Sequence, residues 1–215
     1  MADSIDTRTS WLTPDELATV RSQVPLIYVD AVPVRVDEFG HVTEVGLLLR
    51  AMPDGTISRA IVSGRVLFGE RIREALLRHL EKDLGPVALP RLPPAVAPFT
   101  VIEYFPDPMR SGFHDPRHHA VSLAFVVPVD GDCAPSQDSL DLAWLTPAEA
   151  LDKARALKLL PVTRETLKDL ARFPTVEACL AEARGRRQPP RMMPRVGRDA
   201  AGRPRRVRSP PWPGR

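Results

Sequence analysis

The chain has 215 residues, 43% of them hydrophobic, which is enough to bury one ordinary core. Its longest largely apolar run, residues 120–129, has only the length of a strand, so neither a membrane-spanning helix nor a membrane partner is expected. The first ten residues are polar and partly acidic, unlike a secretion signal, and the only two cysteines are far apart. These features favour a reduced, cytoplasmic protein.

The net charge of +3 averages two unlike regions. Residues 184–215 hold 11 arginines and one aspartate, a net of +10, whereas residues 1–183 carry 19 basic and 26 acidic side chains, a net of −7. Seven prolines and little aliphatic patterning in residues 184–215 are typical of a disordered tail. We therefore expect a flexible N-terminus (1–10), one domain (11–183) and a disordered Arg/Pro-rich tail. Nucleic acid is expected as a partner only through the phosphate-binding capacity of this tail.

The first half of the domain reads as strands framed by two helices. A capping box, Thr13-Pro14-Asp15-Glu16, predicts a short helix to about residue 23. Alternating valines predict a strand over 27–36, followed by a turn at 38–41 and a hairpin partner over 44–51. After the turn at 53–55, a strand is expected over 57–62. A glycine-turned loop then leads into a charged, leucine-bearing helix over 71–84.

The second half begins with a proline-rich connector over 86–98. Strands are expected over 99–105, 119–129 and 140–145, with a loop over 106–117 between the first two. A second capping box, at 146–149, begins a helix to about residue 158. A last helical region over 163–183 is interrupted at Phe173-Pro174. This order of elements predicts one mixed α/β domain.

The glycine loop and its helix carry the most specific pattern in the chain. Five residues separate Gly64 from Glu70, seven more separate Glu70 from Arg78, and Gly85 follows the helix. With these spacings the segment resembles the Nudix box, the signature of hydrolases that cut nucleoside diphosphates linked to another moiety. The resemblance extends over about residues 25–160. It implies a Nudix-type α/β/α sandwich with a mixed sheet, in a bacterial subgroup with a degenerate box.

Only part of the family's carboxylate set is present. Of its four positions, Glu70 keeps the acid, Asp83 keeps the charge on a shorter side chain, and His79 and Lys82 replace the other two acids. The resemblance implies a divalent cation, because bound metals neutralise the charge that develops during diphosphate hydrolysis. We expect Glu70, His79 and Asp83 as metal ligands and catalytic residues, with His79 as a ligand or general base. An imidazole ligand favours Mn²⁺ or Zn²⁺ over Mg²⁺.

Four residues of the box are expected to contact phosphate. Gly64 and Arg65 stand where the loop would approach a diphosphate, although a plain surface arginine is the alternative at 65. Arg78 matches the family's arginine. The ammonium of Lys82 would repel a metal ion but can itself hold a phosphate.

Secondary candidates lie outside the box. Glu103 falls on a predicted strand and would serve as a supplementary acid, as such residues do in many relatives. His114, Asp115 and His118 stand close together on one loop, where they would suit a metal or a phosphate. The alternative for that loop is a polar surface segment.

Two functions remain open at this stage. One is hydrolysis of a nucleoside diphosphate-linked compound at an atypical divalent-metal site. The other is a catalytically inactive Nudix-like domain that binds a nucleotide or phosphorylated ligand as a sensor or interaction module. Both predict a small nucleotide-like ligand. The oligomeric state is left open, and a homodimer is compatible with the sequence.

Overall fold

The computed structural model describes residues 11–51, 55–135, 139–152, 155 and 157–185, and the backbone of three short strands beyond them. The N-terminal segment expected to be flexible and most of the basic tail lie outside these residues. Within the tail, β9 (Arg191–Met192) pairs with β5, and β10 (Arg195–Arg198) pairs with β11 (Pro204–Val207).

A mixed sheet forms the centre of the domain, and β1 (Leu26–Val36) is its middle strand. β1 pairs in parallel with β7 on one side, while on the other its first half pairs with β4 and its second half with β2. The sheet continues from β2 to β3 and β8, and from β7 to β5 and β6. The bounds of these strands are β2 Val42–Ala51, β3 Ile57–Ala60, β4 Val62–Arg65, β5 Thr100–Phe105, β6 Phe113–His114, β7 Ala120–Pro128 and β8 Asp141–Leu145.

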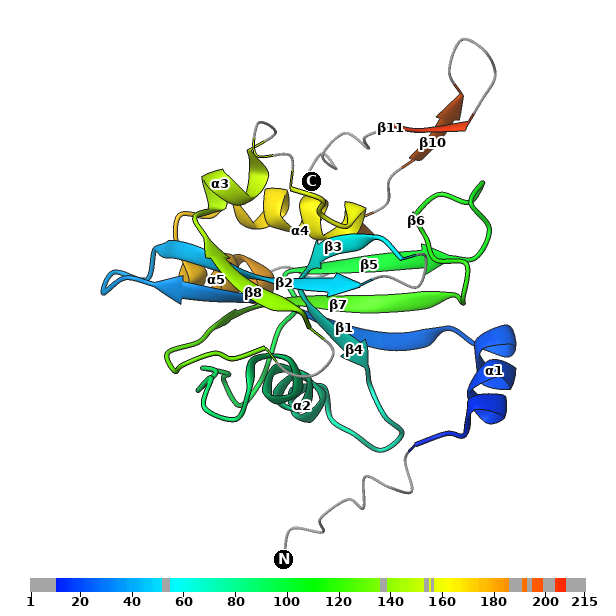
Figure 1. Ribbon diagram of the computed structural model, residues 1–215, viewed down its shortest axis with the longest axis horizontal. Helices are drawn as coiled ribbons and strands as arrows, with labels where there is room; N and C mark the ends of the chain where they lie inside the picture. Colours follow the sequence, from blue (N-terminus) through cyan, green and yellow to red (C-terminus); the bar gives the residue numbers. More distant parts are fainter. Residues whose placement is uncertain are drawn as a thin grey trace, which may run out of the picture.

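Helices cover both faces of the sheet (Figure 1). α2 (Ile72–Leu84) lies on one face, and α3 (Pro147–Leu151), α4 (Pro161–Leu170) and α5 (Val176–Gly185) lie on the other, while α1 (Pro14–Gln23) stands at one end. The expected α/β/α sandwich with a mixed sheet is therefore confirmed. In the part of the chain that the structure describes, every helix is too short or too polar to cross a membrane.

Successive residues of β1 supply two hydrophobic cores, because side chains alternate between the faces of a strand. Val29 packs in the core that contains Leu76 and Leu80 of α2. Val34 packs in the opposite core, with Leu167 of α4. Full burial of one such aliphatic side chain stabilises the fold by about 1.5–3 kcal/mol. The core on the α2 side thereby fixes the helix of the box against the sheet.

Most expected elements are present, with three differences. The helix that begins at Thr146 ends at Leu151 rather than near residue 158. The strand expected over 57–62 is two strands, because Ala60 pairs with β2 whereas Val62 pairs with β1, which leaves Ile61 at the change of partner. The loop expected over 106–117 contains the short strand β6.

Candidate functional site

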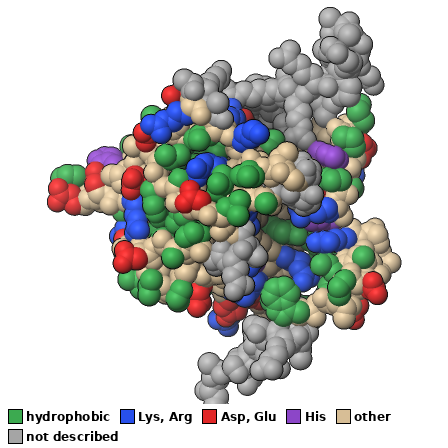
Figure 2. Space-filling model, in the orientation of Figure 1, with side chains coloured by type: hydrophobic (Ala, Val, Ile, Leu, Met, Phe, Trp, Pro, Cys, Tyr) green, Lys and Arg blue, Asp and Glu red, His purple; other side chains and the backbone are tan. Residues whose placement is uncertain are grey.

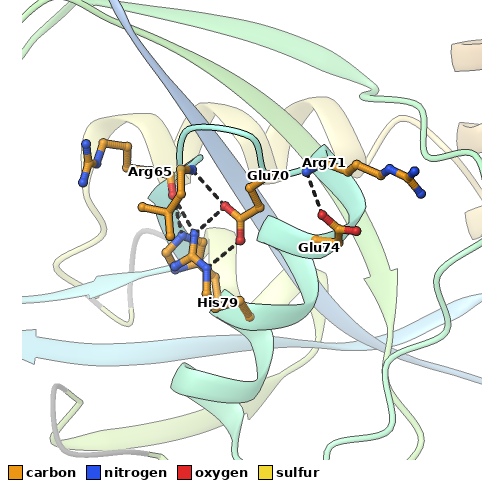
Figure 3. Close-up of polar contacts among 7 residues, drawn as sticks. Arg65, Glu70, Arg71, Glu74 and His79 are labelled. Atoms are coloured by element: carbon orange, nitrogen blue, oxygen red, sulfur yellow. Dashed lines mark hydrogen bonds and ion pairs between the residues drawn. The ribbon is translucent and has the colours of Figure 1, made fainter. Parts of the chain in front are cut away.

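Glu70 joins the glycine loop to α2 through hydrogen bonds to both. Its carboxylate accepts two hydrogen bonds from Arg78 of α2, Nε to Oε1 at 2.7 Å and Nη2 to Oε2 at 2.8 Å. Oε2 also accepts the backbone N–H of Leu67 at 2.9 Å (Figure 3). Burial raises the pKa of Glu70, but the bonds from Arg78 and Leu67 outweigh it, and the pKa lies below its ordinary value. Glu70 is thus an ionised structural anchor whose oxygens are already engaged.

Arg78 also holds the glycine loop in place, through hydrogen bonds of its guanidinium. Besides Glu70, its Nη2 donates to the carbonyl of Arg65 at 2.9 Å, which ties α2 to the end of β4. Its guanidinium also lies 5.7 Å from the ring centroid of Trp11, just before α1. Charge-assisted bonds of this kind contribute about 1.5–3 kcal/mol each. The guanidinium of Arg78 is therefore committed to holding the loop.

His79 points into the protein, where only 7% of the residue is exposed. Its Nε2 lies 3.0 Å from the carbonyl oxygen of Arg65. Because a carbonyl can only accept, Nε2 carries the hydrogen in this arrangement. Burial is the main cause that lowers the pKa of His79, with Arg78 adding to it and the Arg65 carbonyl, Asp83 and Glu70 opposing it. The imidazole is therefore neutral at neutral pH.

The glycine of the box makes room for this ring. Gly64 pairs with Val29 in the sheet, and a Cβ built on it would meet Cε1 of His79 at 1.8 Å. No other side chain fits at position 64 while the ring stays in place. In this chain Gly64 is thus explained by close packing with His79 rather than by an open cradle for phosphate.

Asp83 lies on the same helix and is buried, with 1% of the residue exposed. It forms an ion pair with Nη2 of Arg50 on β2, whose side chain is 21% exposed. Burial raises the pKa of Asp83 above its ordinary value, against the attraction of Arg50 and of Lys82. Lys82 itself is exposed. Two cations therefore lie near one carboxylate here, and the Oδ1 atom of Asp83 is buried with no hydrogen-bond partner among the described residues.

This set of donors does not fit the divalent metal that the resemblance implies. Mg²⁺ prefers several free carboxylate oxygens. Here Glu70 is bound by Arg78, Asp83 is bound by Arg50, and Lys82 adds a cation. Among the described residues, no group of three or more His, Cys, Asp and Glu side chains could hold a metal ion. Glu70, His79 and Asp83 are not brought together as a metal centre.

The secondary candidates lie on other strands and loops. Glu103 is half-buried in β5, opposite Val121 of β7. His114 is exposed on β6. Asp115 accepts bidentate hydrogen bonds from the guanidinium of Arg117. Burial raises the pKa of Asp115, but these bonds outweigh it and the pKa lies below its ordinary value.

The last of these candidates, His118, is buried, and its ring stacks on Tyr28 with 5.4 Å between centroids. Two residues that were not among the expected site residues lie near the sites, Arg50 beside Asp83 and Arg21 of α1 beside His118. Nothing in the local sequence marks either of them, because each contact joins segments that are far apart in the chain.

Comparisons with known proteins agree with this fold. Residues 7–171 match the family described as "Domain of unknown function (DUF4916)". A solved structure from Jonesia denitrificans, described as a possible asymmetric diadenosine tetraphosphate (Ap4A) hydrolase, is 56% identical with a TM-score of 0.67 and covers 72% of this chain and 98% of that one. A search among curated proteins finds no match.

More distant structures share the fold alone. The Nudix domain of NrtR from Shewanella oneidensis, solved with ADP-ribose, is 15% identical with a TM-score of 0.51, over 75% of this chain and 98% of that one. A MutT protein from Methanosarcina mazei is 18% identical with a TM-score of 0.50, over 70% and 96%. The match over residues 7–171 shows that the chain belongs to the DUF4916 family, and the fold of the chain is that of the Nudix structures.

Proposed function

We propose that the chain binds a nucleotide-like compound with linked phosphates at the box, and that it does so without a metal held by the box carboxylates. The observation that carries this proposal is the pair of cations, Arg50 and Lys82, around the single carboxylate of Asp83. Arg50 and Lys82 thus both carry a positive charge at this part of the site. Such a site attracts phosphate directly.

The role of the metal can be taken by these side chains when the task is binding. In a metal site, the cation links carboxylates to phosphate oxygens. Here the guanidinium of Arg50 already lies on Asp83, and it has further N–H groups, of which Nε is buried without a partner. A planar guanidinium suits phosphate because it donates two parallel hydrogen bonds. Lys82, which is exposed next to Asp83 on α2, adds a second charge.

The relatives suggest which ligands to try. The Shewanella oneidensis domain was solved with ADP-ribose, and the Jonesia denitrificans protein is described as a possible Ap4A hydrolase. Both compounds carry a chain of linked phosphates between two larger groups. We use them as probes of the ligand class.

Hydrolysis at an atypical metal site is the second candidate. Two observations favour it, namely the 56% identity to the possible Ap4A hydrolase and the buried Oδ1 of Asp83, which has no hydrogen-bond partner. In that case Asp83 and His79 would hold a Mn²⁺ or Zn²⁺ ion, and Arg50 would have to leave Asp83.

One experiment separates the two candidates. ADP-ribose and Ap4A are titrated into the full chain in EDTA, and separate samples with Mg²⁺, Mn²⁺ or Zn²⁺ are analysed for cleavage products. We expect binding that survives EDTA and no cleavage. Lys82→Gln should weaken binding roughly tenfold or more, because it removes one charge-assisted contact. Lys168 lies in α4, on the opposite face of the sheet, so Lys168→Gln should not change ligand binding.

The opposite pattern would refute the proposal. Binding that requires a metal, together with cleavage that disappears in Asp83→Asn but persists in the exposed control Glu81→Gln, would establish the hydrolase instead. Binding that is equal in Lys82→Gln and the parent chain would show that the ligand does not use the box.

A further inference from the structure

A second polar site lies at the end of the sheet, away from the helix of the box. A cavity of about 560 Å³ opens between the last turn of α1 and the segment that leads into β7. Its polar lining includes Arg21, Arg117, His118 and His119. Figure 2 shows basic side chains gathered on this part of the surface, between α1 and the sheet. The volume is within the range of small-molecule sites.

Three nitrogen atoms of this lining are buried and have no hydrogen-bond partner. They are Nε of Arg21, Nδ1 of His118 and Nε2 of His119. A buried polar atom without a partner costs about 1–3 kcal/mol, and such atoms in native proteins normally meet water or a ligand. The described residues supply no partner to these three atoms, and all three belong to side chains that line the cavity.

The charge of the lining points to an anion. None of the described residues that line the cavity is an aspartate or glutamate. The neighbouring acid, Asp115, is already bound by Arg117, whose Nη2 donates to Oδ2 at 2.6 Å. Arg21 therefore brings a positive charge from α1 to a cavity whose described lining holds two imidazoles.

The two imidazoles are held in fixed orientations. The ring of His118 stacks on Tyr28, and the ring of His119 stacks on Phe105 with 4.7 Å between centroids. His118 is only 3% exposed, so its ring cannot turn freely. Rings that are ordered before a ligand arrives lose little entropy on binding.

We propose that this pocket binds the phosphoryl group of a small phosphorylated molecule. Phosphoryl oxygens accept hydrogen bonds from a guanidinium and from imidazole N–H groups, which are the donors gathered here. The remaining volume takes the molecule that carries the group. The pocket is formed by α1 and the segment before β7, so it does not depend on the function proposed for the box.

The test uses inorganic phosphate and the full chain. The protein has five histidines, whose ring nitrogen signals can be followed separately by NMR during a phosphate titration. We expect saturable shifts for His118 and His119, and none for the exposed His41 and His114. Signals that all drift together without saturation would overturn the proposal. Equal shifts with succinate would overturn the assignment to a phosphoryl group.

Matched variants locate the binding. Arg21→Gln keeps a polar side chain on exposed α1 and should weaken phosphate binding roughly tenfold or more. Arg91→Gln, a surface arginine paired with Asp130, should bind as the parent chain does. Lys82→Gln, which tests the box, should also leave the His118 and His119 shifts unchanged. Loss of the His118 and His119 shifts in Lys82→Gln, or an unchanged phosphate affinity in Arg21→Gln, would overturn the proposal that this pocket binds phosphate.

Discussion

Replacement of Gly64 by alanine tests the packing that distinguishes this box. The added Cβ would lie 1.8 Å from Cε1, 2.1 Å from Nε2 and 2.2 Å from Nδ1 of His79. Ordinary contacts between such atoms are about 3.5–4.0 Å, so the ring would have to move by roughly 1.5–2 Å. Only 7% of His79 is exposed, and the ring cannot move that far without losing its bond to the Arg65 carbonyl.

The expected loss of stability has two parts, the overpacking of the His79 ring and the loss of its hydrogen bond. Overpacking of a core costs about 1–3 kcal/mol, and a lost hydrogen bond adds about 1 kcal/mol. Gly64→Ala should therefore lower the free energy of unfolding by about 2–4 kcal/mol, measured by urea denaturation. For a chain of this length, the melting temperature should fall by roughly 5–15 °C.

A double-mutant cycle gives the decisive result. His79→Ala removes the ring that clashes, so the added methyl group fits in the double variant. The combined cost of Gly64→Ala and His79→Ala should then be about 1.5–3 kcal/mol less than the sum of the single costs. Gly185→Ala is the control, because nothing lies within 4 Å of a Cβ there, and its effect should stay within about 1 kcal/mol. If the stability costs of the two substitutions were additive, or if Gly64→Ala did not change stability, the close packing of Gly64 against His79 would be refuted.

Two further predictions concern charge. Arg50→Met leaves the buried carboxylate of Asp83 without its partner and should cost about 3–5 kcal/mol in urea denaturation, whereas Arg50→Met with Asp83→Leu should recover most of it. Burial lowers the pKa of His79 below its ordinary value of 6.5, so this imidazole takes up a proton in the unfolded chain before it does so in the folded chain as the pH falls. The contribution of His79 to the free energy of unfolding is therefore complete above pH 6.5 and is lost as the pH falls below it. Burial also lowers the pKa of His118, so His79→Gln should reduce the pH dependence of stability without abolishing it. An unchanged dependence of stability on pH in His79→Gln would contradict the lowered pKa of His79.

The sequence predicted those parts of the fold that local chemistry decides. The capping boxes at Thr13 and Thr146 start helices at the expected residues because a hydroxyl and a glutamate three positions later satisfy backbone groups within one turn. The alternation over 27–36 became β1 because its two faces meet two cores. The break at Ile61 was not predicted, since it depends on which strand each neighbouring residue pairs with.

The loop and the helix of the box were predicted in position, but the hydrogen bonds of their side chains were not. The spacing from Gly64 to Gly85 located the loop and its helix, and this part was correct. The expected metal centre required Glu70 and Asp83 to have free oxygens. Both oxygens of Glu70 and one oxygen of Asp83 bind arginines instead. The partner of Asp83, Arg50, lies 33 residues away in the sequence, on β2. Such a contact is decided by tertiary packing, so the pattern of the box contains no sign of it.

The position of Arg50 also decides how this box could be rebuilt. A designer who wished to install the family's chemistry would first return acids to positions 79 and 82. With Arg50 still on Asp83, the new acids would face a fixed positive charge in the place that a metal ion needs. A glutamate at 79 would also leave empty part of the space now filled by the imidazole against Gly64. Conversion therefore requires a change on β2 together with the changes on α2, and single substitutions along the helix would be poor guides to what the box can become.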